Sequence, residues 1–236
     1  MRRQRAIGLL ATKTIRSIER KFQVATGHNT KVVLWEVDAQ TDFMLPGGKL
    51  YVPGAEKKIP NMRRLVDAVR AGKVFLISST DQHAPNDPEF QRFPPHCVRG
   101  TSGAEIVAEL KAAEPVQVEN TGAAQIPGDI CRTQQVVIEK QTLDVFDNPA
   151  TEKLLGQFPA NCEFVVFGVV TEFCVRLAVQ GLLDRGREVA LVTDAIETLD
   201  ASEGEKTLHE LAGRGAQMIN TNEALALIER SSVRGA

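Results

Sequence analysis

Apolar runs of strand length alternate with segments of helical periodicity along most of this 236-residue chain. Residues 32–40 (VVLWEVDAQ) have the composition of a strand, and residues 59–69 then place apolar side chains three and four positions apart, as a helix packed on a sheet does. The most apolar run, FVVFGVV, is typical of a central strand covered on both faces. This alternation predicts a three-layer αβα fold of the α/β class, in which a six-stranded parallel sheet forms the middle layer and helices cover both of its faces. The expected strands are residues 32–40, 73–79, 135–140, 164–170, 188–195 and 216–220.

The first 30 residues differ in composition from the rest of the chain. Apolar residues between Ile7 and Ile18 are spaced so that a basic amphipathic helix can form. We expect residues 1–30 to be an appended helix that packs on the domain or on a sister subunit, with a membrane-surface or targeting role as the alternative. Residues 31–236 are expected to form one domain. The only acid of the extension, Glu19, stands against seven basic residues: Arg2, Arg3, Arg5, Lys13, Arg16, Arg20 and Lys21.

The overall composition excludes several classes of function. With 43% hydrophobic and 25% charged residues, the chain suits a soluble globular domain with a full core. A net charge of −2 gives no reason to expect a nucleic-acid partner, and no apolar run approaches the ~18 residues of a membrane span. The four cysteines are widely scattered and no export signal is evident, so we expect reduced thiols and a cytoplasmic location.

Chemically capable side chains stand where the predicted strands end. In parallel α/β sheets, ligands bind beyond the carboxyl ends of the strands. Asp38 ends the first strand and Lys140 the third, while the strand ending at Val170 leads into a turn that carries Cys174. The second strand is followed by Asp81 and, two residues on, His83. We therefore expect these side chains to meet at one edge of the sheet.

Cys174 lies in GVVTEFCVRLA, a strand followed by the start of a helix. The positive end of the helix dipole is expected to lower the pKa of a thiol there, and the N–H groups of Val170 and Cys174 are suited to hold an oxyanion. Asp38 can accept the thiol proton, and Lys140 can hold the resulting charges in place. This set predicts nucleophilic catalysis. The alternative is that Cys174 is a small buried hydrophobic residue.

Residues 80–97 (TDQHAPNDPEFQRFPPHC) hold two of the four histidines and four prolines. Asp81 and His83 are two positions apart and point the same way on extended chain. His96, with either Glu89 or Asp87, completes a set of nitrogen and oxygen donors. Such a set suits zinc, iron(II) or manganese(II) better than calcium. The alternative is a polar, solvated loop without a ligand.

Five segments occur in an order that resembles a known family. They are VDAQTDF with a following LPGG, TDQH, FPPHCVRGTSGAE, VIEK and GVVTEFCVRLA. Together they are similar to the isochorismatase-like cysteine hydrolases, most closely to the nicotinamidase branch, over roughly residues 31–220. The resemblance implies a Rossmann-like six-stranded sheet. It also implies a metal-dependent amidohydrolase that converts nicotinamide to nicotinate and ammonia through a cysteine thioester.

The resemblance also implies roles for individual residues. Asp38, Lys140 and Cys174 match the catalytic triad, and the Val169–Val170 link falls where the family has a cis peptide beside the oxyanion hole. Phe43 and Phe93, with Val169, match positions that line the substrate pocket. The family binds one divalent metal ion, for which zinc is the first expectation and iron or manganese the alternatives. The matching ligand positions are Asp81, His83, Glu89 and His96.

Some residues depart from the family pattern. Gln82 stands where nicotinamidases commonly have an aromatic residue, Phe173 precedes the cysteine where Tyr or His is common, and Glu36 interrupts the first strand. The second hypothesis is therefore a related cysteine hydrolase acting on another small amide, of maleamate or carbamoyl type. A third is a non-catalytic binding protein on this fold, against which the intact triad argues. A homo-oligomer is expected because family members often form one.

Overall fold

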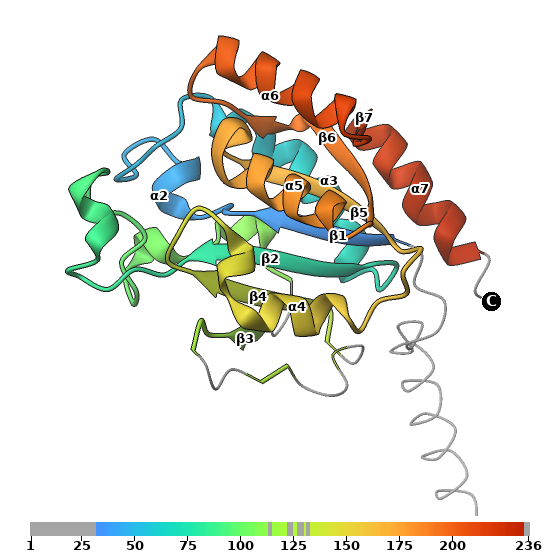
Figure 1. Ribbon diagram of the computed structural model, residues 1–236, viewed down its shortest axis with the longest axis horizontal. Coiled ribbons are helices and arrows are strands. Elements are labelled where there is room, and N and C mark those ends of the chain that lie inside the picture. The colour runs from blue at the N-terminus through green and yellow to red at the C-terminus, as the bar shows by residue number, and fades with distance from the viewer. Residues whose placement is uncertain (1–31, 113–114, 122–124, 127–129, 131–132, 234–236) are drawn as a thin grey trace, which may run out of the picture.

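The computed structural model describes residues 32–112, 115–121, 125–126, 130 and 133–233. The predicted extension at residues 1–30 lies outside them. Over the described residues the chain forms one three-layer α/β sandwich, with helices on both faces of a parallel sheet (Figure 1). The predicted three-layer fold is thus confirmed.

The sheet has seven strands within the described residues, in the order β3-β4-β2-β1-β5-β6-β7, and every neighbouring pair is parallel. The prediction of six strands is therefore wrong by one. The missed strand, β3, pairs only with β4 at the sheet edge, and its three residues (VQV) are mostly half-buried or exposed. A strand this short has no detectable period-two pattern. The strands are β1 (Val32–Val37), β2 (Phe75–Asp81), β3 (Val116–Val118), β4 (Gln135–Lys140), β5 (Glu163–Val169), β6 (Glu188–Glu197) and β7 (Gln217–Ile219).

Two layers of helices cover the sheet. On one face, Leu65 of α3 and Ile228 of α7 share a core cluster with Leu34 of β1. On the other, α4, α5 and α6 pack in the cluster that contains Trp35. The α-helices are α2 (Thr41–Met44), α3 (Ile59–Arg70), α4 (Pro149–Leu155), α5 (Arg176–Asp184), α6 (Ala201–Gly213) and α7 (Thr221–Val233); the shorter turns are η1 (Ala55–Lys58), η2 (Pro88–Gln91), η3 (Ser102–Ala104), η4 (Ala108–Leu110), η6 (Val145–Asp147) and η7 (Thr171–Val175).

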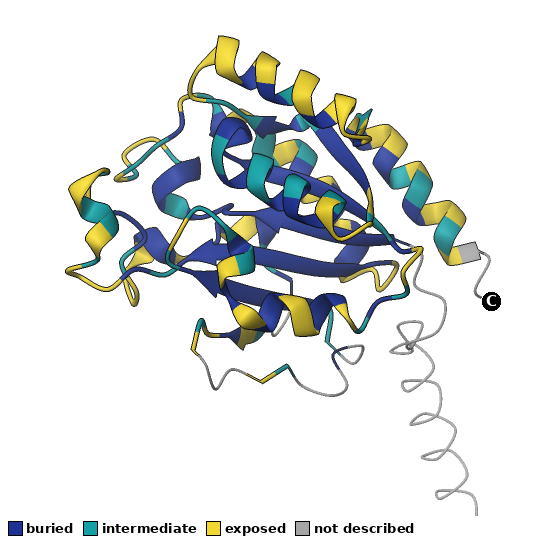
Figure 2. Ribbon diagram, viewed as in Figure 1, coloured by how far each residue is buried: buried dark blue, intermediate teal, exposed yellow. Residues whose placement is uncertain are grey.

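The central strands are buried along their length, whereas the helices expose their outer faces (Figure 2). The predicted helix from residue 59 shows why one side of a helix is buried and the other exposed. Met62, Leu65, Val66 and Val69 of α3 are all fully buried, which confirms the helical spacing read from the sequence. Burying a side chain of this size stabilises the fold by about 1.5–3 kcal/mol, so the apolar stripe is sufficient to hold α3 on the sheet.

Gly168 allows β5 to approach β1 closely near the carboxyl edge of the sheet. Its φ is +126°, and a Cβ atom at this position would lie 2.0 Å from the main-chain oxygen of Val37. Only glycine fits such a contact. The two strand ends that lead to Asp38 and Cys174 are thereby brought together.

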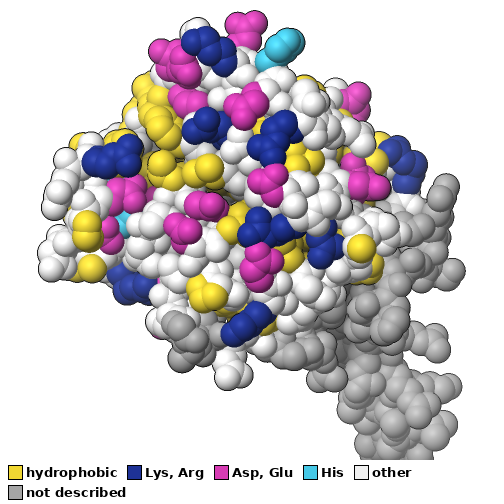
Figure 3. All heavy atoms as spheres, in the orientation of Figure 1, with side chains coloured by type: hydrophobic (Ala, Val, Ile, Leu, Met, Phe, Trp, Pro, Cys, Tyr) yellow, Lys and Arg dark blue, Asp and Glu magenta, His cyan; other side chains and the backbone are white. Residues whose placement is uncertain are grey.

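The surface agrees with the small net charge. On the face shown in Figure 3, basic and acidic side chains are interspersed. Among the helices of the described residues, none has the length and apolar character needed to cross a membrane.

Candidate active site

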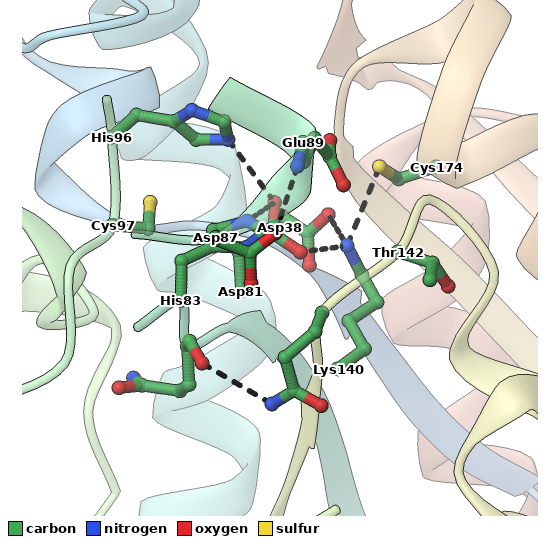
Figure 4. A network of polar contacts seen from close by, with 12 residues as sticks. Asp38, Asp81, His83, Asp87, Glu89, His96, Cys97, Lys140, Thr142 and Cys174 are labelled. Carbon is green, nitrogen blue, oxygen red and sulfur yellow. Dashed lines mark hydrogen bonds and ion pairs between the residues drawn. The ribbon is translucent and has the colours of Figure 1, made fainter. Parts of the chain in front are cut away.

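Four adjacent strands bring the predicted side chains to one edge of the sheet. Lys140 ends β4, Asp81 ends β2, Asp38 follows β1, and Cys174 lies in the turn after β5. Because these strands are neighbours in the order β4-β2-β1-β5, residues more than 130 positions apart meet in one cluster (Figure 4). The convergence expected from the sequence is thus observed.

Lys140 lies at the centre of this cluster. Its Nζ is 2.9 Å from Asp38 Oδ2 and 3.5 Å from Cys174 Sγ, and it also contacts Oδ1 of Asp81 (Figure 4). All four side chains are buried. A buried ammonium ion requires charged or hydrogen-bonding partners, which two carboxylates supply here.

The ionic states follow from this burial. Burial alone would lower the pKa of Lys140, but Asp38 and Asp81 hold it well above its ordinary value. Burial alone would also raise the pKa of Asp81, yet Lys140 and the neighbouring histidines outweigh it and keep this pKa below its usual range. The site therefore holds a fixed ammonium–carboxylate pair.

Asp38 and Cys174 are the groups that can exchange a proton. Burial raises the pKa of Asp38 to about 6, against the lowering effect of Lys140. Burial also raises the pKa of Cys174 well above that of a free thiol, although Lys140 lowers it. The expectation of a lowered thiol pKa is wrong for the resting site, because burial and the nearby carboxylates dominate. A neutral thiol thus lies beside a carboxylate whose pKa suits a base near neutral pH.

The turn that carries Cys174 has an unusual backbone. A cis peptide joins Val169 to Val170, as the family resemblance implies. Residues Thr171–Val175 then form a single π-helical turn, and α5 begins only at Arg176. Cys174 therefore lies just ahead of the regular helix, in the kind of irregular turn often found at functional sites.

Asp81, His83 and His96 form a second cluster beside Lys140. Each offers one ligand atom, and these three atoms lie within 4.8 Å of one another, with all three residues buried. The Nε2 atoms of both histidines are 3.8 Å from Asp81 Oδ2. His83 is fully buried, and neither of its ring nitrogens has an aligned hydrogen-bond partner among the described residues. Two imidazoles and one carboxylate, all buried and with both ring nitrogens of His83 lacking an aligned partner, fit a divalent metal ion.

The fourth predicted ligand, Glu89, lies outside this group of three. It is on η2 and half-buried, and burial together with Asp81 raises its pKa. Glu89 is thus near the centre, and its role as a ligand stays a prediction. The alternative candidate, Asp87, caps η2 by accepting the N–H of Glu89 at 2.9 Å.

Aromatic rings surround the two histidines. The ring centroid of His96 lies 5.4 Å from that of Phe43 and 6.4 Å from that of Phe93. Both predicted pocket residues therefore flank the candidate metal centre, while Val169 is buried at the end of β5. A third ring, Phe90, lies 5.3 Å from His83 and was missed by the sequence interpretation. Its position next to Glu89, in the loop that carries the candidate ligands, could have indicated from the sequence that it lies near the metal centre.

Two side chains of the VDAQTDF segment hold in place the main chain beside the candidate metal ligands. The sequence interpretation assigned them no role. Gln40 accepts the N–H of Asp81 and donates to its carbonyl, both at 2.7 Å. Asp42 accepts the N–H of Cys97, the residue after His96, at 2.7 Å. Both are buried, so each fixes a ligand position through the main chain.

Comparison with known proteins agrees with this geometry. A model of the isochorismatase domain matches residues 32–123 and 112–223. The chain belongs to the isochorismatase domain family. The nicotinamidase of Escherichia coli (strain K12) is 24% identical to this chain over 207 residues, which cover 77% of this chain and 91% of that protein. The predicted resemblance to the nicotinamidase branch is therefore confirmed.

Solved structures share the isochorismatase fold. The pyrazinamidase of Pyrococcus horikoshii, solved in complex with zinc, is 27% identical with a TM-score of 0.63, and the match covers 80% of this chain and 99% of that one. The N-carbamoylsarcosine amidase of Thermoplasma acidophilum is 20% identical with a TM-score of 0.61, and the match covers 81% and 96%. At the lower identity the likeness concerns the fold alone.

Proposed function

We propose that this isochorismatase-family protein is a metal-dependent cysteine amidohydrolase that converts nicotinamide to nicotinate and ammonia. The observation that supports it most is the buried arrangement of Cys174, Lys140 and Asp38, with Lys140 Nζ 3.5 Å from the sulfur and 2.9 Å from the carboxylate. A thiol, a base and a fixed cation within contact distance are the parts that acyl transfer through a cysteine requires.

In the proposed reaction, Cys174 Sγ attacks the carboxamide carbon while Asp38 takes the thiol proton. The N–H groups of Val170 and Cys174 hold the oxyanion. Asp38 then passes its proton to the nitrogen as the C–N bond breaks and ammonia leaves. In the second half, Asp38 takes a proton from water, whose oxygen attacks the thioester carbon. The C–S bond breaks, and Asp38 returns the proton to the sulfur.

The metal centre is proposed to hold the substrate rather than to carry these steps. Asp81, His83 and His96 are its proposed ligands, with Glu89 as the fourth, and zinc is the first candidate, with iron and manganese as alternatives. A divalent ion there supplies a Lewis acid that can anchor a ring nitrogen of the substrate. Phe43 and Phe93, which flank His96, are suited to pack against an aromatic ring. The nicotinamidase relative and the pyrazinamidase structure named above support an amide as the substrate class.

The test is ammonia release from nicotinamide by purified protein loaded with zinc, manganese(II) or iron(II). Turnover is expected with wild type and absent from Cys174→Ala. Metal-loaded wild type that releases no ammonia from nicotinamide contradicts the substrate assignment. A second amide that is turned over in the same assay would then preserve the hydrolase class.

The observation that favours another small amide is Gln82. Its side chain is polar and half-buried between Asp81 and His83, and its Nε2 donates to the carbonyl of Ala104 at 3.2 Å. Gln82 replaces the aromatic residue that nicotinamidases commonly have at this position. A panel of maleamate- and carbamoyl-type amides, compared with nicotinamide by kcat/KM, decides between the two candidates. Homo-oligomer formation and a cytoplasmic location stay predictions.

A further inference from the structure

Asp87 lies between two of the candidate ligands of the metal centre. Its Oδ2 is 3.1 Å from Nδ1 of His83, and its Oδ1 accepts the main-chain N–H of Glu89 at 2.9 Å (Figure 4). The carboxylate is largely buried, with 10% of the side chain exposed. Each of its oxygens therefore faces a different candidate ligand residue.

His96 shows how an acceptor beside Nδ1 determines which ring nitrogen carries the proton. Nδ1 of His96 is 2.8 Å from the carbonyl oxygen of Pro94, a pure acceptor, so this nitrogen carries the proton. Nε2 then keeps a free lone pair, and it is the Nε2 atom that lies 3.8 Å from Asp81 Oδ2. Metal-binding histidines commonly have their second ring nitrogen held by a carbonyl or carboxylate in this way.

His83 has the same layout, but with a carboxylate in place of the carbonyl. Its Nε2 is 3.8 Å from Asp81 Oδ2, while its Nδ1 faces Asp87. The Nδ1–H is not yet aligned on the Asp87 oxygen. The two atoms are already within hydrogen-bond distance, at 3.1 Å, and hydrogen bonds of this kind often tighten only when the ligand binds.

We propose that Asp87 is a positioning residue of the metal centre rather than one of its ligands. One oxygen takes the Nδ1–H of His83, so that Nε2 faces the ion. The other holds the N–H of Glu89, so that the turn carrying this carboxylate stays beside the centre. Asp87 lies at the edge of the His83 ring opposite to the one that binds the ion, so it cannot coordinate the ion without releasing Nδ1. This inference rests on the proposed metal-dependent function.

Asp87→Asn is the informative variant. Asparagine caps a helical turn as well as aspartate does, so η2 is expected to persist. With its oxygen retained by the N–H of Glu89, the amide NH2 faces Nδ1 of His83 and can only donate. The proton of the ring must then move to Nε2, which removes the lone pair that binds the metal. Zinc affinity, measured by competition with a chelator, is expected to fall about 10- to 100-fold.

Asp144→Asn is the matched control. Asp144 caps η6 by accepting the N–H of Phe146 at 2.9 Å, the same contact that Asp87 makes with Glu89, but it forms no ion pair with a histidine among the described residues. Its replacement is expected to leave zinc affinity unchanged. An equal loss of affinity in both variants would assign the effect to general loosening of capped turns and overturn the proposal.

A second readout uses neither metal nor substrate. Nitrogen-15 NMR of metal-free protein in alkaline buffer, where the imidazoles are neutral, reports which ring nitrogen carries the proton. His83 is expected to be protonated on Nδ1 in wild type and in Asp144→Asn, and on Nε2 in Asp87→Asn. The same tautomer of His83 in all three proteins overturns the proposal, and so does a wild type that binds none of zinc, manganese(II) and iron(II). If nicotinamide is not hydrolysed but the tautomer and affinity changes appear, the inference holds and only the substrate assignment fails.

Discussion

Lys140 and Asp81 are cross-strand partners at the last paired position of β4 and β2, and the lysine ammonium contacts the aspartate carboxylate. The same ammonium lies 2.9 Å from Asp38. One cation therefore neutralises both the proposed catalytic base and a proposed metal ligand. The two halves of the site are joined through this buried side chain.

Replacing Lys140 with methionine is expected to destabilise the protein and abolish activity. Two buried carboxylates lose their cation, and breaking a buried ion pair on one side costs about 3–5 kcal/mol. Urea unfolding measures the loss. Lys111→Met is the control, since Lys111 pairs with Glu105 at the surface, and exposed pairs contribute only about 0–1 kcal/mol. Equal losses in both variants would contradict the role of Lys140.

Cys174 is expected to react with iodoacetamide faster than the buried thiols of Cys97 and Cys162 at neutral pH. Burial raises the pKa of all three, to about 12 for Cys162. Of these three thiols, only Cys174 has an ammonium 3.5 Å from its sulfur, and this cation favours the thiolate. The neighbouring Asp38 raises the thiol pKa in the resting site, but it can accept the thiol proton during attack. Mass-spectrometric mapping after a short exposure measures the rates. A Cys174 no faster than Cys162 would count against the mechanism.

The rate of amide hydrolysis is expected to fall as the pH drops through about 6. Burial raises the pKa of Asp38 to about 6, and only the ionised form can accept the thiol proton, so activity is full above this pH and is lost below it. The acid limb of kcat/KM against pH measures this. Because histidine ligands also protonate in acid, metal content is determined at each pH. An acid limb that follows metal loss alone would remove Asp38 as its cause.

Glu36 is expected to make the protein less stable as the pH rises. It is fully buried in β1, accepts a hydrogen bond from Ser78 Oγ at 2.6 Å, and burial raises its pKa from 4.5 to about 8. The folded state holds this proton more tightly than the unfolded state. The contribution to stability is therefore complete below pH 4.5 and declines up to about pH 8.

Glu36→Gln should remove this dependence. At ~1.4 kcal/mol per pKa unit the difference is on the order of a few kcal/mol. Urea unfolding at pH 5.5 and 8.5, compared between wild type and Glu36→Gln, measures it. If both proteins lose the same stability over this range, the carboxyl group is not the cause.

His96→Ala is expected to lower bound metal and activity together. Losing one of three or four protein ligands removes several kcal/mol of binding and leaves the geometry undefined. His209, on an exposed position of α6, is the control, and His209→Ala should change neither quantity. Elemental analysis and ammonia release are the measurements. Full activity of wild type in the presence of a chelator would show that residues 80–97 act only as a polar connector.

The sequence alone determined, to within a few residues, where six of the strands end and which chemistry those ends offer. Period and apolar content placed six of the strands, because buried strands and amphipathic helices need these patterns locally. The strand-end positions of Asp38, Asp81, Lys140 and Cys174 followed directly, since ligand sites of parallel sheets lie at the carboxyl ends.

The tertiary structure alone decided how these ends meet and what state each group adopts. The strand order β4-β2-β1-β5 is not the chain order, so no local pattern shows that Lys140 contacts both Asp38 and Asp81. The raised pKa of Cys174 likewise depends on desolvation by residues distant in sequence. Asp87 and Glu89 are two positions apart and both acidic, and only folding turns one toward Nδ1 of His83. Local sequence sets propensity and side-chain chemistry, whereas burial and long-range contact set charge state and role.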